Sequence, residues 1–162
     1  MAIKPNNPGA TIEVPWFYDD AIDREKSDLD ALEEECEHPT GNWKKHAVLK
    51  DGQLVTRFVI GVIPPGPFAR LMTDAGGIPS LQVYWHAFLF GLRDIIDGPT
   101  STTHTTKDGV PEAVPKNDVG GMKCVDEAWL SKVFSGPKAK AAYDVGRAIY
   151  NWHVLPEKDL KN

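Results

Sequence analysis

The sequence has little of what exported, membrane-spanning or nucleic-acid-binding proteins require. Its two cysteines, Cys36 and Cys124, allow one disulfide at most, and residues 1–14 lack the apolar core of a signal peptide. We therefore expect two reduced thiols in a cytosolic protein. The longest strongly apolar run is about ten residues, half of what a membrane span needs. A formal net charge of −5 argues against general nucleic-acid binding, which requires a basic face.

Catalytic signatures are also absent from the sequence. It contains no nucleotide-binding loop, no GxSxG turn and no HExxH metal pair. Acid–base catalysis by carboxylates needs two that face each other and have different pKa values, and one acidic helix does not supply such a pair. A zinc site built from four donors is an alternative, although their C-x-H-x₇-H spacing matches no standard zinc pattern; these donors are Cys36, His38, His46 and Cys124. We predict no enzyme activity, no metal and no cofactor.

A turn signal in the first half of the chain predicts a β-hairpin. Asp51-Gly52 suits the positive φ angles of a type I′ turn, and the following residues 54–63 are rich in β-branched side chains. Residues 48–49 would end the shorter first strand, and the prolines of 64–67 end the second. A short helix over 67–77 is expected next, with a proline in its first turn and a glycine at its end.

The helix predicted over residues 80–97 is apolar on almost every side. Ser80 is its expected N-cap. Trp85 and Phe90 belong to an apolar surface that is wider than a single core-facing stripe. Such a helix either occupies the centre of the fold or forms part of an oligomer interface. The central position is the favoured interpretation, and self-association is the alternative.

Two further helices are predicted near the C-terminus, after a loop over 98–121 that is rich in Thr, Pro and Gly. Asp126 is the expected N-cap of the first helix. Gly136-Pro137 begins the second, which carries Trp152 on its apolar side. Gly146, preceded by an alanine one turn earlier, leaves room for close contact with another helix.

The first 37 residues carry two candidate binding surfaces. Three prolines predict an extended arm over 1–18, and burial of Trp16, Phe17 and Tyr18 would stabilise whatever surface receives them, either on the same domain or on a neighbouring subunit. Residues 19–37 hold ten acidic and two basic residues and predict an acidic helix with a narrow apolar stripe. Its expected acidic surface consists of Asp28, Asp30, Glu33, Glu34, Glu35 and Glu37.

Three phrases within residues 47–152 resemble those of small phage tail assembly chaperones: VLKDGQLVTRFVI, FLFGLRDIIDG and VDEAWLSKVFSGPKAKAAYDVGRAIYNW. That family often shows a strand with an LxDG turn, a helix ending in a DG-like phrase and a final WL…F…G helical region. The proline-rich arm and the Thr-rich loop look more like the reaching segments of a phage neck or tail protein. The resemblance implies an assembly or structural role with tail or capsid subunits as partners, in the host cytoplasm during assembly or retained in the virion. It carries over no catalytic residue.

We therefore predict an α+β fold with a β-hairpin packed on a small helical bundle. The extended arm over 1–18 precedes one domain over 19–162. The predicted function is non-catalytic protein binding in phage particle assembly, without direct contact to nucleic acid or membrane. Its predicted partner-binding residues are Trp16, Phe17, Tyr18, Trp85, Phe90 and Trp152. The alternative is an acidic inhibitor that mimics nucleic acid and binds a basic partner through residues 19–37.

Overall fold

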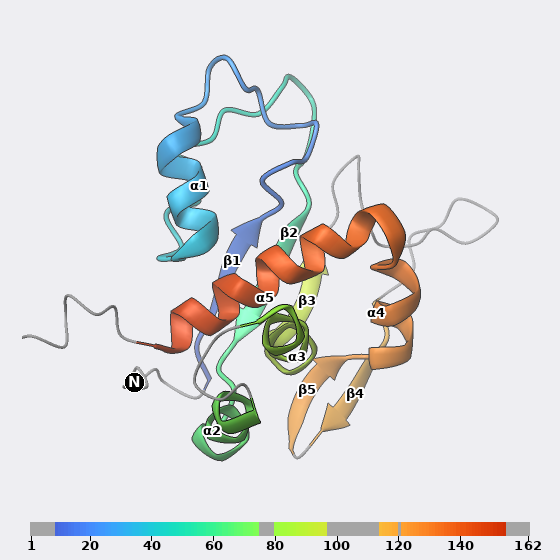
Figure 1. The fold of residues 1–162 in the computed structure, drawn as a ribbon. Coiled ribbons are helices and arrows are strands. Elements are labelled where there is room, and N and C mark those ends of the chain that lie inside the picture. Colours follow the sequence, from blue (N-terminus) through green and yellow to red (C-terminus); the bar gives the residue numbers. More distant parts are fainter. Residues whose placement is uncertain (1–8, 75–79, 97–113, 120, 155–162) are drawn as a thin grey trace, which may run out of the picture.

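The computed structural model describes residues 9–74, 80–96, 114–119 and 121–154. Within these ranges the chain forms a three-stranded antiparallel sheet, a separate two-stranded hairpin and five α-helices, so the predicted α+β class is confirmed. Helices α3 (Leu81–Gly91) and α5 (Ala139–His153) cross one face of the larger sheet (Figure 1). In the described part of the chain, every helix is too short or too polar to cross a membrane.

The larger sheet has the strand order β1-β2-β3, so β2 (Arg57–Gly61) lies in the middle. β1 (Thr11–Pro15) pairs antiparallel with one edge of β2, and β3 (Leu92–Ile96) pairs antiparallel with the other. Phe58 and Ile60 of β2 are fully buried, as expected for alternate residues that point from a strand into the core. The sheet therefore joins three segments that are far apart in the sequence.

The hairpin predicted around Asp51-Gly52 is wrong, although the tight turn itself forms with Gly52 at a φ of 71°. The chain on the two sides of the turn does not pair with itself. Leu49 instead forms an isolated bridge with Ile22, and β2 pairs with β1 and β3. The strand after the turn is apolar enough for a central position, and a central strand has both edges covered by other strands.

The helix predicted over 80–97 begins as expected but ends early. Ser80 caps α3 by accepting a hydrogen bond from the Val83 amide at 3.4 Å. The helix ends at Gly91 and the chain continues directly as β3, so the prediction is wrong for residues 92–96. The third strand covers the second edge of β2, which a longer helix would leave open.

Helix α3 lies in the core, and α5 packs closely along it. Val83, Ala87 and Phe88 of α3 are buried, which confirms the central position favoured from the sequence. A Cβ atom on Gly146 of α5 would lie 1.9 Å from the backbone oxygen of Tyr84. Only glycine allows this approach, so the close helix contact predicted at Gly146 is also confirmed.

The remaining described elements surround this core. They are α1 (Leu29–Glu37), a 3₁₀ turn at Trp43–Lys45, α2 (Pro65–Asp74), β4 (Lys116–Val119), β5 (Met122–Val125), α4 (Glu127–Val133) and a 3₁₀ turn at Gly136–Lys138. Asp126 caps α4, as predicted, by accepting a hydrogen bond from the Trp129 amide at 3.0 Å. The short helix predicted over 67–77 begins two residues earlier than expected, and residues 75–79 lie outside the described residues.

The two predicted irregular segments have partly regular structure. Thr11–Pro15 of the predicted arm is extended but forms β1, with Val14 buried, so this part packs on its own sheet; residues 1–8 lie outside the described residues. Of the predicted loop over 98–121, residues 98–113 and 120 also lie outside them. Lys116–Val119 forms β4 in a hairpin with β5, so the loop prediction is wrong there. Its polar sequence carries no apolar alternation that would indicate a strand.

Candidate functional site

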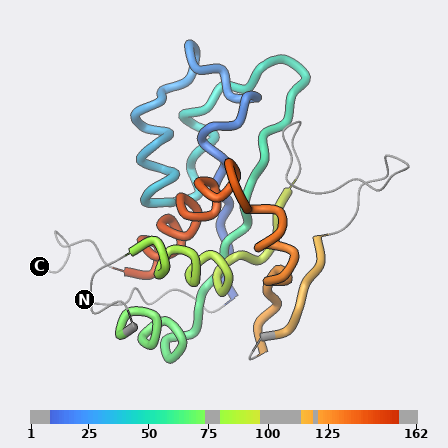
Figure 2. The backbone as a smooth tube through the Cα atoms, turned by 45° about the vertical axis from the view of Figure 1, so that its right-hand side comes forward, coloured from blue at the N-terminus to red at the C-terminus, as the bar shows by residue number. Residues whose placement is uncertain are grey.

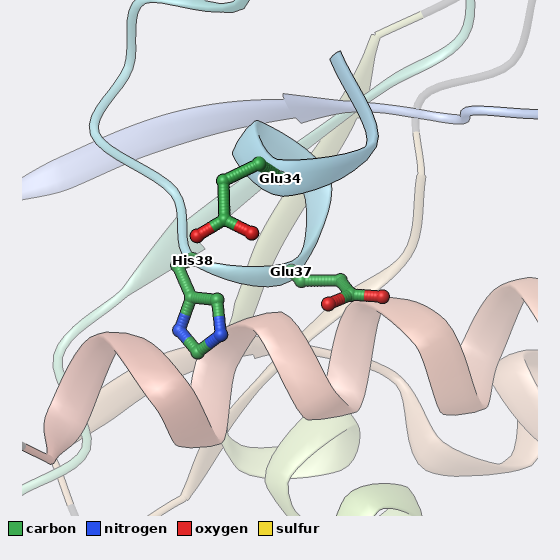
Figure 3. Close-up of side chains that lie close together, drawn as sticks. All are labelled: Glu34, Glu37 and His38. Carbon is green, nitrogen blue, oxygen red and sulfur yellow. The ribbon is translucent and has the colours of Figure 1, made fainter. Parts of the chain in front are cut away.

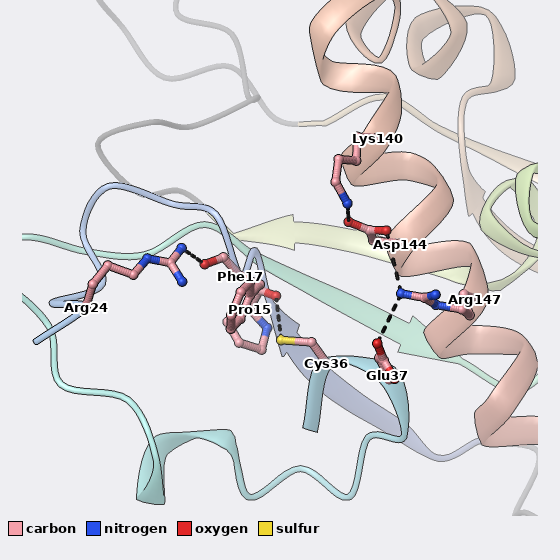
Figure 4. A network of polar contacts seen from close by, with 8 residues as sticks. All are labelled: Pro15, Phe17, Arg24, Cys36, Glu37, Lys140, Asp144 and Arg147. Carbon is pink, nitrogen blue, oxygen red and sulfur yellow. Dashed lines mark hydrogen bonds and ion pairs between the residues drawn. The ribbon is translucent and has the colours of Figure 1, made fainter. Parts of the chain in front are cut away.

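A pocket lies where the end of β1 meets α1 and α5 (Figure 4). Its cavity volume is about 50 Å³. This is room for a few water molecules or one small chemical group. The pocket is lined by the end of β1 and the aromatic segment after it, together with Glu33, Cys36 and Glu37 of α1 and Lys140, Asp144 and Arg147 of α5. It brings the predicted aromatic arm and the predicted acidic helix into one site.

The aromatic segment is held in place by a buried carboxylate. Asp19 is fully buried, and its two oxygens accept hydrogen bonds from the Ala21 amide at 2.8 Å and the Thr56 amide at 2.9 Å. The Trp16 amide also donates to the Thr56 carbonyl at 2.9 Å. These bonds tie the chain leaving β1 to the residue that precedes β2, so the segment has a defined conformation.

Two cations lie over the aromatic rings of this segment. The Arg24 guanidinium lies 4.5 Å from the centre of the Phe17 ring and donates a hydrogen bond to the Phe17 carbonyl. The Lys140 ammonium lies 4.7 Å from the centre of the Tyr18 ring. Both distances suit cation–π attraction. Tyr18 is still 50% exposed, so it presents an aromatic surface to solvent beside these cations.

A chain of ion pairs runs from α5 to the end of α1 (Figure 4). Asp144 pairs with Lys140 at 3.0 Å and with Arg147 at 3.8 Å, and Arg147 also pairs with Glu37 at 3.4 Å. The side-chain amide of Asn151 donates to the Glu37 carbonyl at 2.8 Å, which caps the end of α1. Each partly exposed pair stabilises the fold by at most about 1 kcal/mol. Their main effect is to neutralise the carboxylates next to the pocket.

The two cysteines occupy different sites and both are protonated near neutral pH. Burial, helped by the charge of Glu35, raises the pKa of Cys36 to about 12, and its thiol lies 3.6 Å from the Pro15 carbonyl. Burial also raises the pKa of Cys124 on β5, although the Arg93 guanidinium acts in the opposite direction. A protonated thiol is a weak nucleophile.

The structure does not bring the four donors of the alternative zinc site together, although all four lie within the described residues. α1 and β5, which carry the two cysteines, lie at different sides of the fold (Figure 1). The described residues contain a different group of possible ligands, Glu34, Glu37 and His38, whose ligand atoms lie within 4.8 Å of one another (Figure 3). Glu34 and His38 are exposed, and Glu37 already pairs with Arg147. A metal ion bound by this surface group would compete with water and with the Arg147 guanidinium for the carboxylates.

The structure divides the predicted partner-binding residues into two sets. Trp152 is 7% exposed and belongs to the core, so its assignment to a binding surface is wrong. The apolar side of α5 faces α3 and the sheet, which leaves this ring inside the fold. Trp85 and Phe90 are half-buried at the side of the core, as are Trp16 and Phe17 at the pocket. Tyr18 is the most exposed member of the predicted set.

The acidic surface is smaller than predicted. The helix begins at Leu29, capped by Asp28, and residues 19–28 form turns instead. Glu35 is only 8% exposed because its carboxylate turns inward to accept hydrogen bonds from the amide and the hydroxyl of Thr40, so its assignment to the surface is wrong. The carboxylates that remain exposed are those of Asp28, Asp30, Glu33 and Glu34.

A surface that the sequence predicted only in part lies at one end of the sheet. Residues 16–28 and 46–56, which we call the loop end, both extend beyond the same end of β1 and β2 (Figures 1 and 2). The Asp23 amide donates to the Val48 carbonyl at 2.8 Å, which joins the two loops. Four large apolar side chains are strongly exposed among the described residues: Leu54 and Leu81 at 62%, Tyr18 at 50% and Val48 at 41%. Three of them belong to the loop end.

These features define an α+β protein with a small charge-lined pocket beside an exposed apolar loop end. The aromatic run at 16–18 predicted Tyr18 as part of a binding surface, whereas no sequence signal indicated the exposure of Val48 and Leu54. Searches with this chain found no matching protein-family model, no matching curated protein and no matching solved structure.

Proposed function

We propose that the protein is a non-catalytic binding protein of phage assembly, which contacts other phage structural or assembly proteins through its loop end. The observation that carries this proposal is that three of the four strongly exposed large apolar side chains of the described residues, Tyr18, Val48 and Leu54, lie on two joined loops. Burial of exposed apolar side chains against a second protein is favourable. We propose that these contacts form in the host cytoplasm during assembly. If the protein is a structural subunit, the contacts would persist in the virion.

The loop end is suited to binding because its backbone is already ordered. Asp19 ties the first loop to the start of β2, and the Ile22–Leu49 bridge joins the first loop to the second. A surface that is ordered before binding loses less conformational entropy on association.

The proposal is tested by site-specific photo-crosslinking during phage growth. A photoreactive phenylalanine analogue at position 54 is expected to capture a virion or assembly protein. The matched control is position 81, because Leu81 has the same exposure but lies at the start of α3. Capture of the same proteins in equal amounts from positions 54 and 81 would contradict the proposal. Leu54→Ser should reduce incorporation of the protein into assembly complexes at least about tenfold, a loss typical of an anchoring residue.

The exposed carboxylates of α1 support a second candidate function. Asp30, Glu33 and Glu34 present negative charge on the outer side of the helix, and the last turn contains no basic residue. An acidic inhibitor would use this surface to occupy a nucleic-acid site on a basic partner. Its binding should weaken steeply between low and high salt because exposed charges are screened, whereas apolar anchoring at the loop end should change little. Affinity for the captured partner, measured at two salt concentrations, distinguishes the two.

A further inference from the structure

The most unusual titratable group in the core is His153, at the end of α5. It is 1% exposed, and its ring stacks on Phe68 of α2 with 4.8 Å between the ring centres. Its two nitrogens each have a backbone partner at 2.7 Å: Nε2 faces the Ile63 amide and Nδ1 faces the Ile149 carbonyl. One imidazole therefore connects α5, α2 and the chain that joins β2 to α2.

The partners determine the protonation state of this imidazole. An amide can only donate, so Nε2 must accept and carry no proton; a carbonyl can only accept, so Nδ1 must carry the proton. The ring is thus neutral when both hydrogen bonds are present. A second proton would sit on Nε2 and point at the Ile63 N–H from 2.7 Å, inside the core. If the protonated ring kept this position, two N–H donors would face each other and a positive charge would be buried in the core. Both are unfavourable, so protonation drives the ring from this position.

On balance, the surroundings of the ring disfavour its protonated form. Burial is the main reason that the pKa of His153 lies below its ordinary value of 6.5. The hydrogen bond to Ile149 acts in the opposite direction, and the positive charge of Arg93 on β3 lowers the pKa further. Tyr150 on the same helix is a neutral phenol whose own pKa is raised by burial. Arg70 of α2 is exposed in a groove beside His86.

The segment held by this imidazole lies at the margin of the molecule. α2 lies beside the C-terminal end of α5, at the edge of the fold in both views (Figures 1 and 2). Its buried side chains are Phe68, which contacts the ring, and Leu71. α2 also packs against α3. We propose that His153 is an acid-sensitive latch, whose neutral imidazole holds α2 and the chain before it against α5, and whose protonation releases α2 from α5 while the sheet core stays folded.

The direction of the pH effect follows from the lowered pKa. Above pH 6.5 the ring is neutral in both the latched and the released states, so latching is independent of pH. As the pH falls from 6.5 toward the pKa of the latched form, the released state binds more protons and gains population. Below that pKa both states are protonated and the effect stops. Between pH 7.5 and pH 5.0 the released population can increase by at most about thirtyfold, because a released-state pKa of 6.5 limits the effect to about tenfold per pH unit below that value.

Hydrogen exchange tests the latch on the full chain. Between pH 7.5 and pH 5.0, after correction for intrinsic exchange rates, protection of the α2 amides should fall several-fold while protection of α3 is kept. His153→Gln keeps an acceptor for the Ile63 amide without a titrating ring, so its α2 protection should not depend on pH. His38→Gln, at an exposed histidine, should respond like the wild type.

Three results would overturn the proposal. They are α2 protection that does not change with pH in the wild type, equal losses in α2 and α3, and a full pH response that persists in His153→Gln. If His153→Gln does not fold, ring ¹⁵N chemical shifts of the wild type provide the second measurement. They should show the neutral Nδ1–H tautomer at pH 7.5. An Nε2–H tautomer or an imidazolium at that pH would overturn the latch as well.

Discussion

Gly146 sets the distance between the two main helices. A methyl group at this position would meet the backbone oxygen of Tyr84 at 1.9 Å, and a helix backbone cannot turn away as a side chain can. Gly146→Ala should therefore lower the free energy of unfolding by about 2–3 kcal/mol, the upper part of the range for overpacked cores. Urea denaturation measures the change. Gly66→Ala is the control, because its methyl group would meet no atom within 4 Å and should change stability by less than about 0.5 kcal/mol. Equal effects of the two substitutions would contradict the packing argument.

At the scale of elements, the loop end depends on one buried carboxylate. Asp19→Ala would leave the amides of Ala21 and Thr56 buried without their present partners. We expect a loss of about 2–3 kcal/mol in the free energy of unfolding, with the largest increase in hydrogen exchange over 16–28. Asp20→Ala removes the same charge from the neighbouring exposed residue and should be nearly neutral. Comparable destabilisation by Asp20→Ala would show that net charge, rather than hydrogen bonding, orders this loop.

Secondary structure was predictable from sequence where the deciding contacts are local. Ser80 and Asp126 were identified as helix caps because a cap needs only its own side chain and an amide three residues later. The change from helix to strand after Gly91 has no local signal, since an apolar run satisfies either structure. Residues 92–96 form a strand because β2 needs a partner on that edge. The choice therefore depends on chain that lies more than thirty residues away.

At the scale of the whole molecule, the self-association alternative requires an apolar face that the chain does not cover. Most of α3 is covered, and Leu81 is its one strongly exposed large apolar residue. We expect the purified protein to show a monomer mass of 17.9 kDa by light scattering. A larger mass would show that the chain self-associates. If Leu54→Ser, but not Leu81→Ser, restored the monomer, the contact would lie at the loop end. A multimer that neither substitution changes would exclude both surfaces.

The candidate site was only partly predictable, because some of its features are local in the sequence and others join distant segments. The aromatic segment and the acidic helix were both identified from sequence, because unusual local composition is visible without a fold. Their meeting with α5 was not visible, since the ion pair from Glu37 to Arg147 spans 110 residues. Nor was the inward turn of Glu35, which depends on the amide of Thr40 after the helix has ended. Exposure of Val48 and Leu54 followed only from the failure of the expected hairpin.

Sequence patterns were sufficient to predict the α+β class, the helix caps, the core position of α3 and the close approach at Gly146. Periodicity, capping and residue size depend on residues that are neighbours in the sequence, so they can be recognised without knowledge of the fold. Only the tertiary structure decided the strand partners of β2, the burial of Trp152 and Glu35, the neutral state of His153 and the surface left exposed at the loop end. Each of these depends on which distant segment packs on a given apolar edge or pairs with a given amide, because burial and pairing are properties of the folded chain.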